Sequence, residues 1–221
     1  MSLDRPGVLA ALTGLSHLED PLRRKLYEYV TENDGPVSRE QAAAAASIGR
    51  TLAAYHLDKL ADAGLLAVSY QRPAGRGGPG AGRPAKLYTR AAQEITVSVP
   101  PRDYELLARL LVASVEHDTS GTVQQAVNDA AHEAGRRVGA ETGGNVVTAL
   151  RNCGYLPQAD DAGRIKLRNC PFHLVAQDHR DVVCGLNLRL VEGVIAGCGH
   201  PRAHAELEPD TDRCCVVVHD A

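Results

Sequence analysis

Residues 38–66, SREQAAAAASIGRTLAAYHLDKLADAGLL, decide the fold of the first part of this chain. Ser38 followed by Gln41 three residues later forms the pattern of a capping box, which predicts a helix starting at residue 39. Residues 47–49 make a short break, and a second helix is expected from residue 50, with Gly64 as its stop signal. The leucines of this second helix that we expect in a core are Leu52, Leu57 and Leu60. The stretch therefore predicts two helices joined by a tight turn.

The flanking sequence adds a third helix and a hairpin. Asp20 and Pro21 are a helix cap and a favoured first helical residue, so DPLRRKLYEYV at 20–30 is expected to be helical. LLAVSYQ at 65–71 and AKLYTR at 85–90 are typical of strands, and they flank the Gly/Pro-rich segment 73–84. Helix, turn, helix and a two-stranded hairpin with a basic tip are together a winged helix-turn-helix arrangement.

Residues 15–92 resemble the bacterial ArsR-type regulators. The stretch SREQAAAAASIGRTLAAYHLDKLADAGLL and the segment GRPAKLY at 82–88 carry the resemblance. One departure is the alanine run at 42–46, because the supporting helix usually has more varied side chains. The resemblance implies a transcription regulator, a repressor by analogy, that binds double-stranded DNA as a homodimer.

The distribution of charge agrees with a nucleic-acid partner. The net charge is −3, yet residues 50–90 hold seven Lys or Arg residues and two Asp residues, which favours one polyanion-binding surface. A recognition helix in the major groove contacts bases through residues near its N-terminus. The residues that we expect to contact DNA are Ser38, Arg39, Arg50, Thr51, Tyr55, His56, Lys59, Arg76, Arg83 and Lys86. The alternative is a solvated basic face on a winged-helix module that binds protein, for which a steep salt dependence is not expected.

The whole chain is expected to be an α+β protein in three parts. Residues 1–92 are the winged helix-turn-helix domain, 93–144 a helical dimerisation linker, and 145–221 a small α+β sensing domain with an antiparallel sheet. In the linker, residues 100–116 are strongly amphipathic, and small residues dominate the helix at 122–141. These helices serve either a dimer interface or packing within the chain, and both are compatible with the sequence.

The last region contains cysteines at near-regular intervals. LRNCPFH, VCGLNLRLVEGVIAG and RCCVVV resemble actinobacterial relatives of the iron–sulfur repressor of the SUF operon. That resemblance implies an iron–sulfur cluster held by Cys170, Cys184, Cys198 and either Cys214 or Cys215. Strand alternation predicts that only one of the last two can join a site. The alternatives are buried structural cysteines with an unknown effector, a zinc site, and direct thiol oxidation.

Other classes of protein fit the sequence less well. No apolar run is long enough to span a membrane, and the N-terminus lacks the pattern of a secretory signal, so a cytoplasmic location and reduced thiols are expected. Cys170 and His173 are three residues apart, which is weak support for a thiol nucleophile without a third orienting group. We therefore do not expect an enzyme.

Overall fold

A computed structural model describes residues 6–33, 35–71, 84–92, 94–97, 102–160, 162–210 and 213–220. The chain divides into two compact units, Met1–Arg102 and Asp103–Ala221. In the described ranges, no helix combines the length and the apolar character that crossing a membrane requires.

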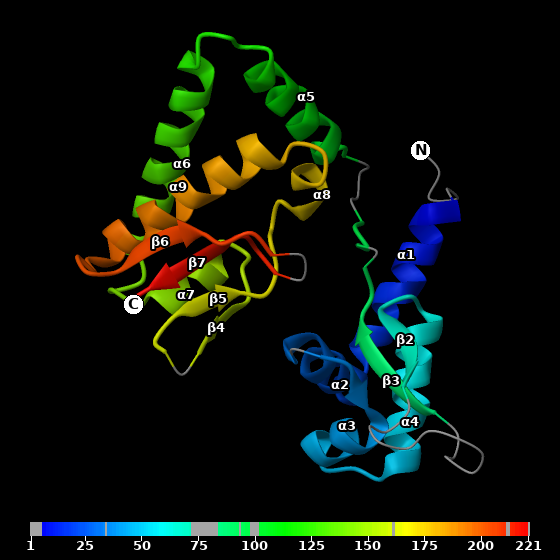
Figure 1. Ribbon diagram of the computed structural model, residues 1–221. Helices are drawn as coiled ribbons and strands as arrows, with labels where there is room; N and C mark the ends of the chain where they lie inside the picture. The colour runs from blue at the N-terminus through cyan, green and yellow to red at the C-terminus, as the bar shows by residue number, and fades with distance from the viewer. Residues whose placement is uncertain are drawn as a thin grey trace. The chain divides into compact units, whose positions relative to one another are not determined.

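The first unit is a set of helices against a small sheet (Figure 1). Its elements are α1 (Pro6–Ser16), the 3-10 helix η1 (His17–Glu19), α2 (Pro21–Glu32), β1 (Val37–Ser38), α3 (Arg39–Ala46), α4 (Arg50–Asp62), β2 (Leu66–Gln71) and β3 (Ala85–Arg90). The sheet is antiparallel with the order β1-β3-β2, so β3 is its central strand. The predicted helix, turn, helix and hairpin are confirmed.

Local signals explain where these helices begin and end. The Ser38 hydroxyl accepts a hydrogen bond from the Gln41 backbone, and the Gln41 side chain accepts one from the Ser38 backbone, so the capping box is present. Asp20 caps α2 in the expected way. Gly64 adopts a φ of +75°, and the Leu65 N–H bonds the Leu60 carbonyl, which ends α4 in a Schellman motif. These boundaries are therefore encoded locally.

The core of the first unit corrects one sequence expectation. Leu57 and Leu60 are fully buried, but Leu52 is 45% exposed and Ala53 takes the core position instead. Residues 53, 57 and 60 are spaced by four and three, which places them on one helix face, and Leu52 lies off that face. The largest side chain against α4 from the sheet is Tyr88, which is buried in the same cluster.

The second unit combines five helices with a four-stranded sheet within its described residues. Its elements are α5 (Tyr104–Glu116), α6 (Thr122–Ala140), α7 (Val146–Asn152), β4 (Pro157–Ala159), β5 (Ile165–Leu167), α8 (His173–Ala176), α9 (Arg180–Cys198), β6 (His204–Leu207) and β7 (Val216–His219). The sheet is antiparallel in the order β4-β5-β7-β6. Helix α9 contacts β6 and β7 as well as α6, α7 and α8, so it is the central element of this unit (Figure 1).

The closest helix pair is α6 with α9, and glycines make it possible. An ideal Cβ built on Gly193 would lie 2.0 Å from the His132 carbonyl oxygen, and one on Gly135 would lie 2.0 Å from the Leu190 carbonyl oxygen. Gly139 and Gly197 show similar approaches to the facing backbone. The small-residue face of α6 is therefore occupied by a helix of the same chain.

Two details of the second unit differ from the expected layout. β7 starts at Val216, so Cys214 and Cys215 lie in a bend before the strand, where side chains do not alternate between two faces. Helix α8, after Cys170, contains only four residues and starts at His173. Both differences bear on the cysteines described below.

Candidate nucleic-acid interface and buried thiol cluster

Helix α4 has one buried side and one side open to solvent. Ala53, Leu57 and Leu60 are fully buried, while Tyr55 is 57% exposed. Arg50 and Thr51, at the start of the helix, are also exposed. The open side therefore places a guanidinium, a hydroxyl and a phenol near the helix N-terminus, which suits contacts to base edges and phosphates.

Two side-chain contacts order this open side. Arg50 Nη1 lies 3.1 Å from Glu40 Oε1 of α3, and Lys59 Nζ lies 5.9 Å from the centre of the Tyr55 ring. Both partners of the Arg50–Glu40 pair are more than half exposed, so the pair is worth little and leaves the guanidinium able to change partner.

The remaining candidates of the two helices differ in accessibility. Ser38 and Arg39 lie at the N-terminus of α3, with the Ser38 hydroxyl used as the cap and the Arg39 guanidinium near Glu40. His56 is buried, with its ring edge-on to Tyr55 at 5.2 Å between centroids. The sequence interpretation placed His56 among the residues that contact DNA, whereas the structure packs it inside the first unit.

Lys86 of β3 is tied to the recognition helix. Its Nζ lies 2.5 Å from Asp58 Oδ1, and the Tyr88 hydroxyl donates to the same oxygen at 2.7 Å. Partial burial raises the pKa of Asp58, but the hydrogen bonds from Lys86 and Tyr88 outweigh it and leave the pKa below its ordinary value. This carboxylate therefore fixes α4 against the hairpin, and in this state the Lys86 charge is paired.

The expected contacts in the hairpin tip cannot be placed, but a neighbouring aromatic can. Arg76 and Arg83 lie outside the described residues. Tyr70 of β2 is 62% exposed and is the cross-strand partner of Lys86. The sequence interpretation missed Tyr70, although an aromatic residue on a strand beside a basic hairpin tip was a usable signal.

Four thiols belong to the core region of the second unit. Cys214 and Cys215 are buried in the core, and the partly buried Cys170 and Cys184 pack against it. We call Cys170, Cys184, Cys214 and Cys215 the thiol cluster. Both Cys214 and Cys215 precede β7, which begins at Val216, so the strand alternation expected to separate their side chains does not apply to them.

A buried amide also points at the centre of the thiol cluster. Asn187 of α9 is fully buried, and its Nδ2 donates to Cys214 Sγ at 3.1 Å. The buried Tyr155 hydroxyl bonds Asn187 Oδ1, and burial raises the pKa of that phenol, so Tyr155 acts as the donor. This contact fixes the amide with its N–H groups facing the sulfur.

These hydrogen-bond donors explain how the pKa values of the thiols are shifted. The Cys170 and Cys215 thiols, the Val216 backbone N–H and the Asn187 amide all hydrogen-bond to Cys214 and hold its pKa well below the ordinary value, against the effect of burial. The same hydrogen bond to Cys214, together with burial, raises the pKa of Cys170. The Phe172 backbone N–H lowers the pKa of Cys170, but the effects of Cys214 and of burial outweigh it.

Cys198 lies apart from the thiol cluster. Its Sγ lies 3.6 Å from the Gly139 carbonyl oxygen and 3.7 Å from Thr142 Oγ1. Cys184 and Cys198 are on the same helix, α9, and fourteen residues of helix span about 21 Å. The structure therefore brings together Cys170, Cys184 and Cys214 of the expected ligand set, with Cys215, and leaves Cys198 elsewhere.

These positions can be compared with the needs of an iron–sulfur cluster. Its four cysteine ligands must surround the cluster core and therefore lie close together in space. Among the residues that the structure describes, no group of three His, Cys, Asp or Glu side chains is arranged to hold a metal ion. The set that includes Cys198 therefore does not fit a cluster.

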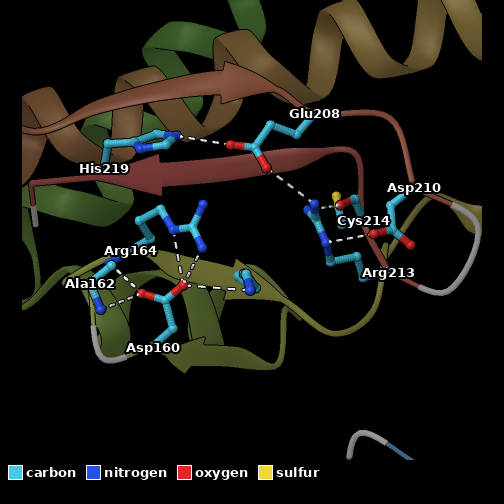
Figure 2. A network of polar contacts seen from close by, with 9 residues as sticks. Asp160, Ala162, Arg164, Glu208, Asp210, Arg213, Cys214 and His219 are labelled. Carbon is cyan, nitrogen blue, oxygen red and sulfur yellow. Dashed lines mark hydrogen bonds and ion pairs between the residues drawn. The ribbon is translucent and has the colours of Figure 1, made fainter.

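Ion pairs hold the loop that carries Cys214. Figure 2 shows Arg213 between Glu208 and Asp210, with distances of 3.2 Å and 3.0 Å between the paired atoms. Arg213 Nη1 also donates to the Cys214 carbonyl oxygen at 3.2 Å, and the Cys214 N–H bonds the Leu167 carbonyl of β5 at 2.9 Å. The backbone at Cys214 is therefore fixed on both sides.

Comparison with known proteins identifies part of the chain. The family model of a helix-turn-helix domain matches residues 18–69, which span α2 to most of β2. No curated protein and no solved structure matches the chain. The first unit thus contains a helix-turn-helix domain, and this class of domain indicates a DNA-binding transcription regulator rather than an enzyme.

Proposed function

We propose that this protein is a homodimeric transcriptional repressor that binds double-stranded DNA through α4 and whose second unit controls operator affinity. The observation that carries the DNA-binding part is the open side of α4, where Arg50, Thr51 and Tyr55 are exposed while the opposite side is buried. The matched family model over residues 18–69 supports the same assignment.

Two arginine variants test the DNA contact. Arg50→Ala removes a charge at the N-terminus of α4, and Arg151→Ala removes the same charge from an exposed position on α7 in the second unit. Binding to the DNA upstream of the protein's own gene is measured by fluorescence anisotropy at several salt concentrations. Loss of one base or phosphate contact weakens binding by about 1–3 kcal/mol, so we expect a loss of about tenfold or more for Arg50→Ala and none for Arg151→Ala.

The salt dependence separates this function from the protein-interaction alternative. A DNA-binding surface releases counterions, so the wild-type affinity should fall steeply as salt increases. If affinity for DNA does not change with salt, or if both arginine variants bind equally well, the proposed DNA contact is wrong.

The proposed dimer interface is the outward face of α5. The polar residues of this helix bind the rest of the second unit: Arg109 pairs with Asp178 and donates to the Leu174 carbonyl, and Glu116 lies 2.8 Å from His179 Nδ1. Its large apolar side chains are each more than half exposed: Tyr104, Leu106, Leu107, Leu110 and Leu111. A helix anchored by its charges with its leucines in solvent indicates a missing partner.

A second copy of this chain is the partner that we propose for α5. The five exposed side chains form one apolar helix face, and such a face supports an interface in which each partner of a stable complex buries about 800 Å². Two copies of α4 must also be paired to read two half-sites, which requires symmetric association.

Oligomeric state in solution tests this interface. Leu107→Glu combined with Leu110→Glu places two charges on the apolar face and should give a monomer by sedimentation velocity. Thr148→Glu adds a charge at an exposed position of α7 and should leave the dimer intact. A wild-type monomer, or a dimer that tolerates both glutamates, would show that α5 is not the interface.

The repressor role and the iron–sulfur cluster rest on the resemblance described above. Repression predicts that transcription from the bound promoter falls when the protein is added to an in vitro transcription reaction. The cluster is tested by iron and sulfide assays after anaerobic purification. The contacts of Cys198 do not favour the cluster, so the proposed control of DNA affinity does not depend on it.

A further inference from the structure

We propose that Tyr70 and Lys86 form a second DNA-contact site on the hairpin of β2 and β3, and that Asp58 of α4 limits the affinity of this site by pairing with Lys86. The site takes the phosphate and sugar groups of a DNA duplex. The inference rests on the proposed function, because it requires α4 to lie in the major groove of the same duplex.

The register of the hairpin places Tyr70 and Lys86 on the face toward α4. Tyr88 is buried and its hydroxyl donates to Asp58 of α4, so the face of β3 that carries Tyr88 is turned toward this helix. Lys86 lies two residues away on the same strand and therefore shares that face. Tyr70 is the cross-strand partner of Lys86, so its side chain lies on the same face of the hairpin.

The exposure and the chemistry of Tyr70 suit a DNA backbone. Among the described aromatic residues of the first unit, only Tyr70 and Tyr55 are more than half exposed, at 62% and 57%. A phenol hydroxyl donates to a phosphate oxygen, and the ring packs against a sugar or a base. Tyr55 belongs to the open side of α4, so both exposed rings lie on elements that we place at the DNA.

Lys86 supplies the cation of this site, but its charge is paired. Its Nζ lies 2.5 Å from Asp58 Oδ1, and the Asp58 side chain is 47% exposed, so the pair is accessible from solvent. A DNA phosphate must compete with this carboxylate for Lys86, and the carboxylate left behind repels the phosphate. Asp58 therefore lowers the affinity for any duplex, and base contacts from α4 decide more of the total binding.

This masking role and a purely structural role of Asp58 predict opposite results. If the carboxylate only fixes the hairpin against α4, its loss loosens the hairpin and weakens DNA binding. If it masks Lys86, its loss frees the ammonium group for a phosphate and strengthens DNA binding. Asp58→Asn distinguishes the two, because an amide oxygen still accepts the hydrogen bond from Tyr88 while the negative charge is gone.

The experiment measures binding of the full-length chain to two duplexes by fluorescence anisotropy at several salt concentrations. One duplex is the DNA upstream of the protein's own gene, and the other is an unrelated sequence of the same length. Asp58→Asn should bind both about threefold more tightly, with a salt slope steeper by about 1, because one more phosphate contact releases about one more counterion. Asp58→Asn combined with Lys86→Ala should lose both gains.

A second variant guards against a folding defect in Asp58→Asn. Asp58→Ala also removes the carboxylate, and alanine is favoured in a helix, so we expect the same gain in affinity. Circular dichroism checks that each variant is folded before its binding is measured.

Tyr70→Phe tests the tyrosine contact separately. Loss of one neutral hydrogen bond should weaken binding to both duplexes by about two- to tenfold, and the salt slope should not change because no cation is altered. Ser69→Ala is the matched control, since Ser69 is exposed, precedes Tyr70 on β2 and lies on the opposite face of the hairpin. It should bind both duplexes like the wild type.

Three results would overturn the inference. They are carboxylate variants that bind no more tightly than the wild type, a gain in affinity that persists without Lys86, and a Tyr70→Phe variant that binds like the wild type. In each case DNA binding by the wild type that is weakened by Arg50→Ala still supports the proposed function. A wild type that binds neither duplex would refute the proposed function and the inference with it.

Discussion

Replacing Gly193 with alanine should destabilise the second unit, although the same change usually stabilises a helix. At Gly193 the added Cβ would meet the His132 carbonyl oxygen at 2.0 Å, the His132 carbonyl carbon at 2.8 Å and the Arg136 nitrogen at 3.0 Å. All three atoms are backbone, so no side chain can move aside and α6 and α9 must separate.

The expected magnitude comes from two opposing terms. Alanine is favoured over glycine in a helix interior by about 1 kcal/mol. Overpacking a tight contact costs about 1–3 kcal/mol and occasionally more, and a clash with rigid backbone belongs at the upper end. We therefore expect Gly193→Ala to lower the free energy of unfolding by about 2 kcal/mol.

Gly185 provides a matched control on the same helix. A Cβ at Gly185 meets no atom within 4 Å, so Gly185→Ala should raise the free energy of unfolding by about 0.5–1 kcal/mol. Urea unfolding followed by far-UV circular dichroism measures both variants against the wild type. The reasoning is refuted if Gly193→Ala is as stable as the wild type, or if the two variants shift the midpoint in the same direction.

Two further predictions concern the first unit. Ser38→Ala removes the cap of α3 and leaves the Gln41 N–H without its partner, so it should destabilise this unit by about 1 kcal/mol, while Ser38→Asp should retain most of the stability in the same urea titration. Because the pKa of Asp58 is lower in the folded chain, its contacts with Lys86 and Tyr88 contribute stability above about pH 4 and lose it as the pH falls further. The wild type should therefore lose stability in acid more steeply than Asp58→Asn, and parallel pH profiles would contradict this.

The sequence by itself determined the first unit to a large extent. The Ser38 capping box, the Asp20 cap and the Gly64 stop are local signals, since each depends on residues within a few positions of one another. Helix boundaries and the hairpin could therefore be predicted. The error at Leu52 arose because a leucine next to the buried face of α4 is compatible with either side until the sheet packs against it.

The sequence also located the cysteine-containing region, but it could not select the cysteines that meet. By spacing in the sequence, Cys198 and Cys184 are equivalent candidates, yet they lie near opposite ends of helix α9. The sequence interpretation assumed a strand that already contained Cys214 and Cys215, in which alternation would send their side chains to opposite faces. β7 instead starts one residue after Cys215, so Cys215 can join the thiol cluster. The positions of Asn187 and Tyr155 gave no local signal at all.

Only the tertiary structure decided which apolar helix faces were satisfied within the chain. The pattern of α5 and α6 indicated two amphipathic helices, and either face was a candidate interface. Packing of α9 against the glycines of α6 occupies one face, while Arg109 holds α5 with its leucines in solvent. Periodicity in the sequence shows that a helix face is apolar. Which segment packs against that face depends on contacts between parts of the chain far apart in the sequence, and only the folded structure brings these together.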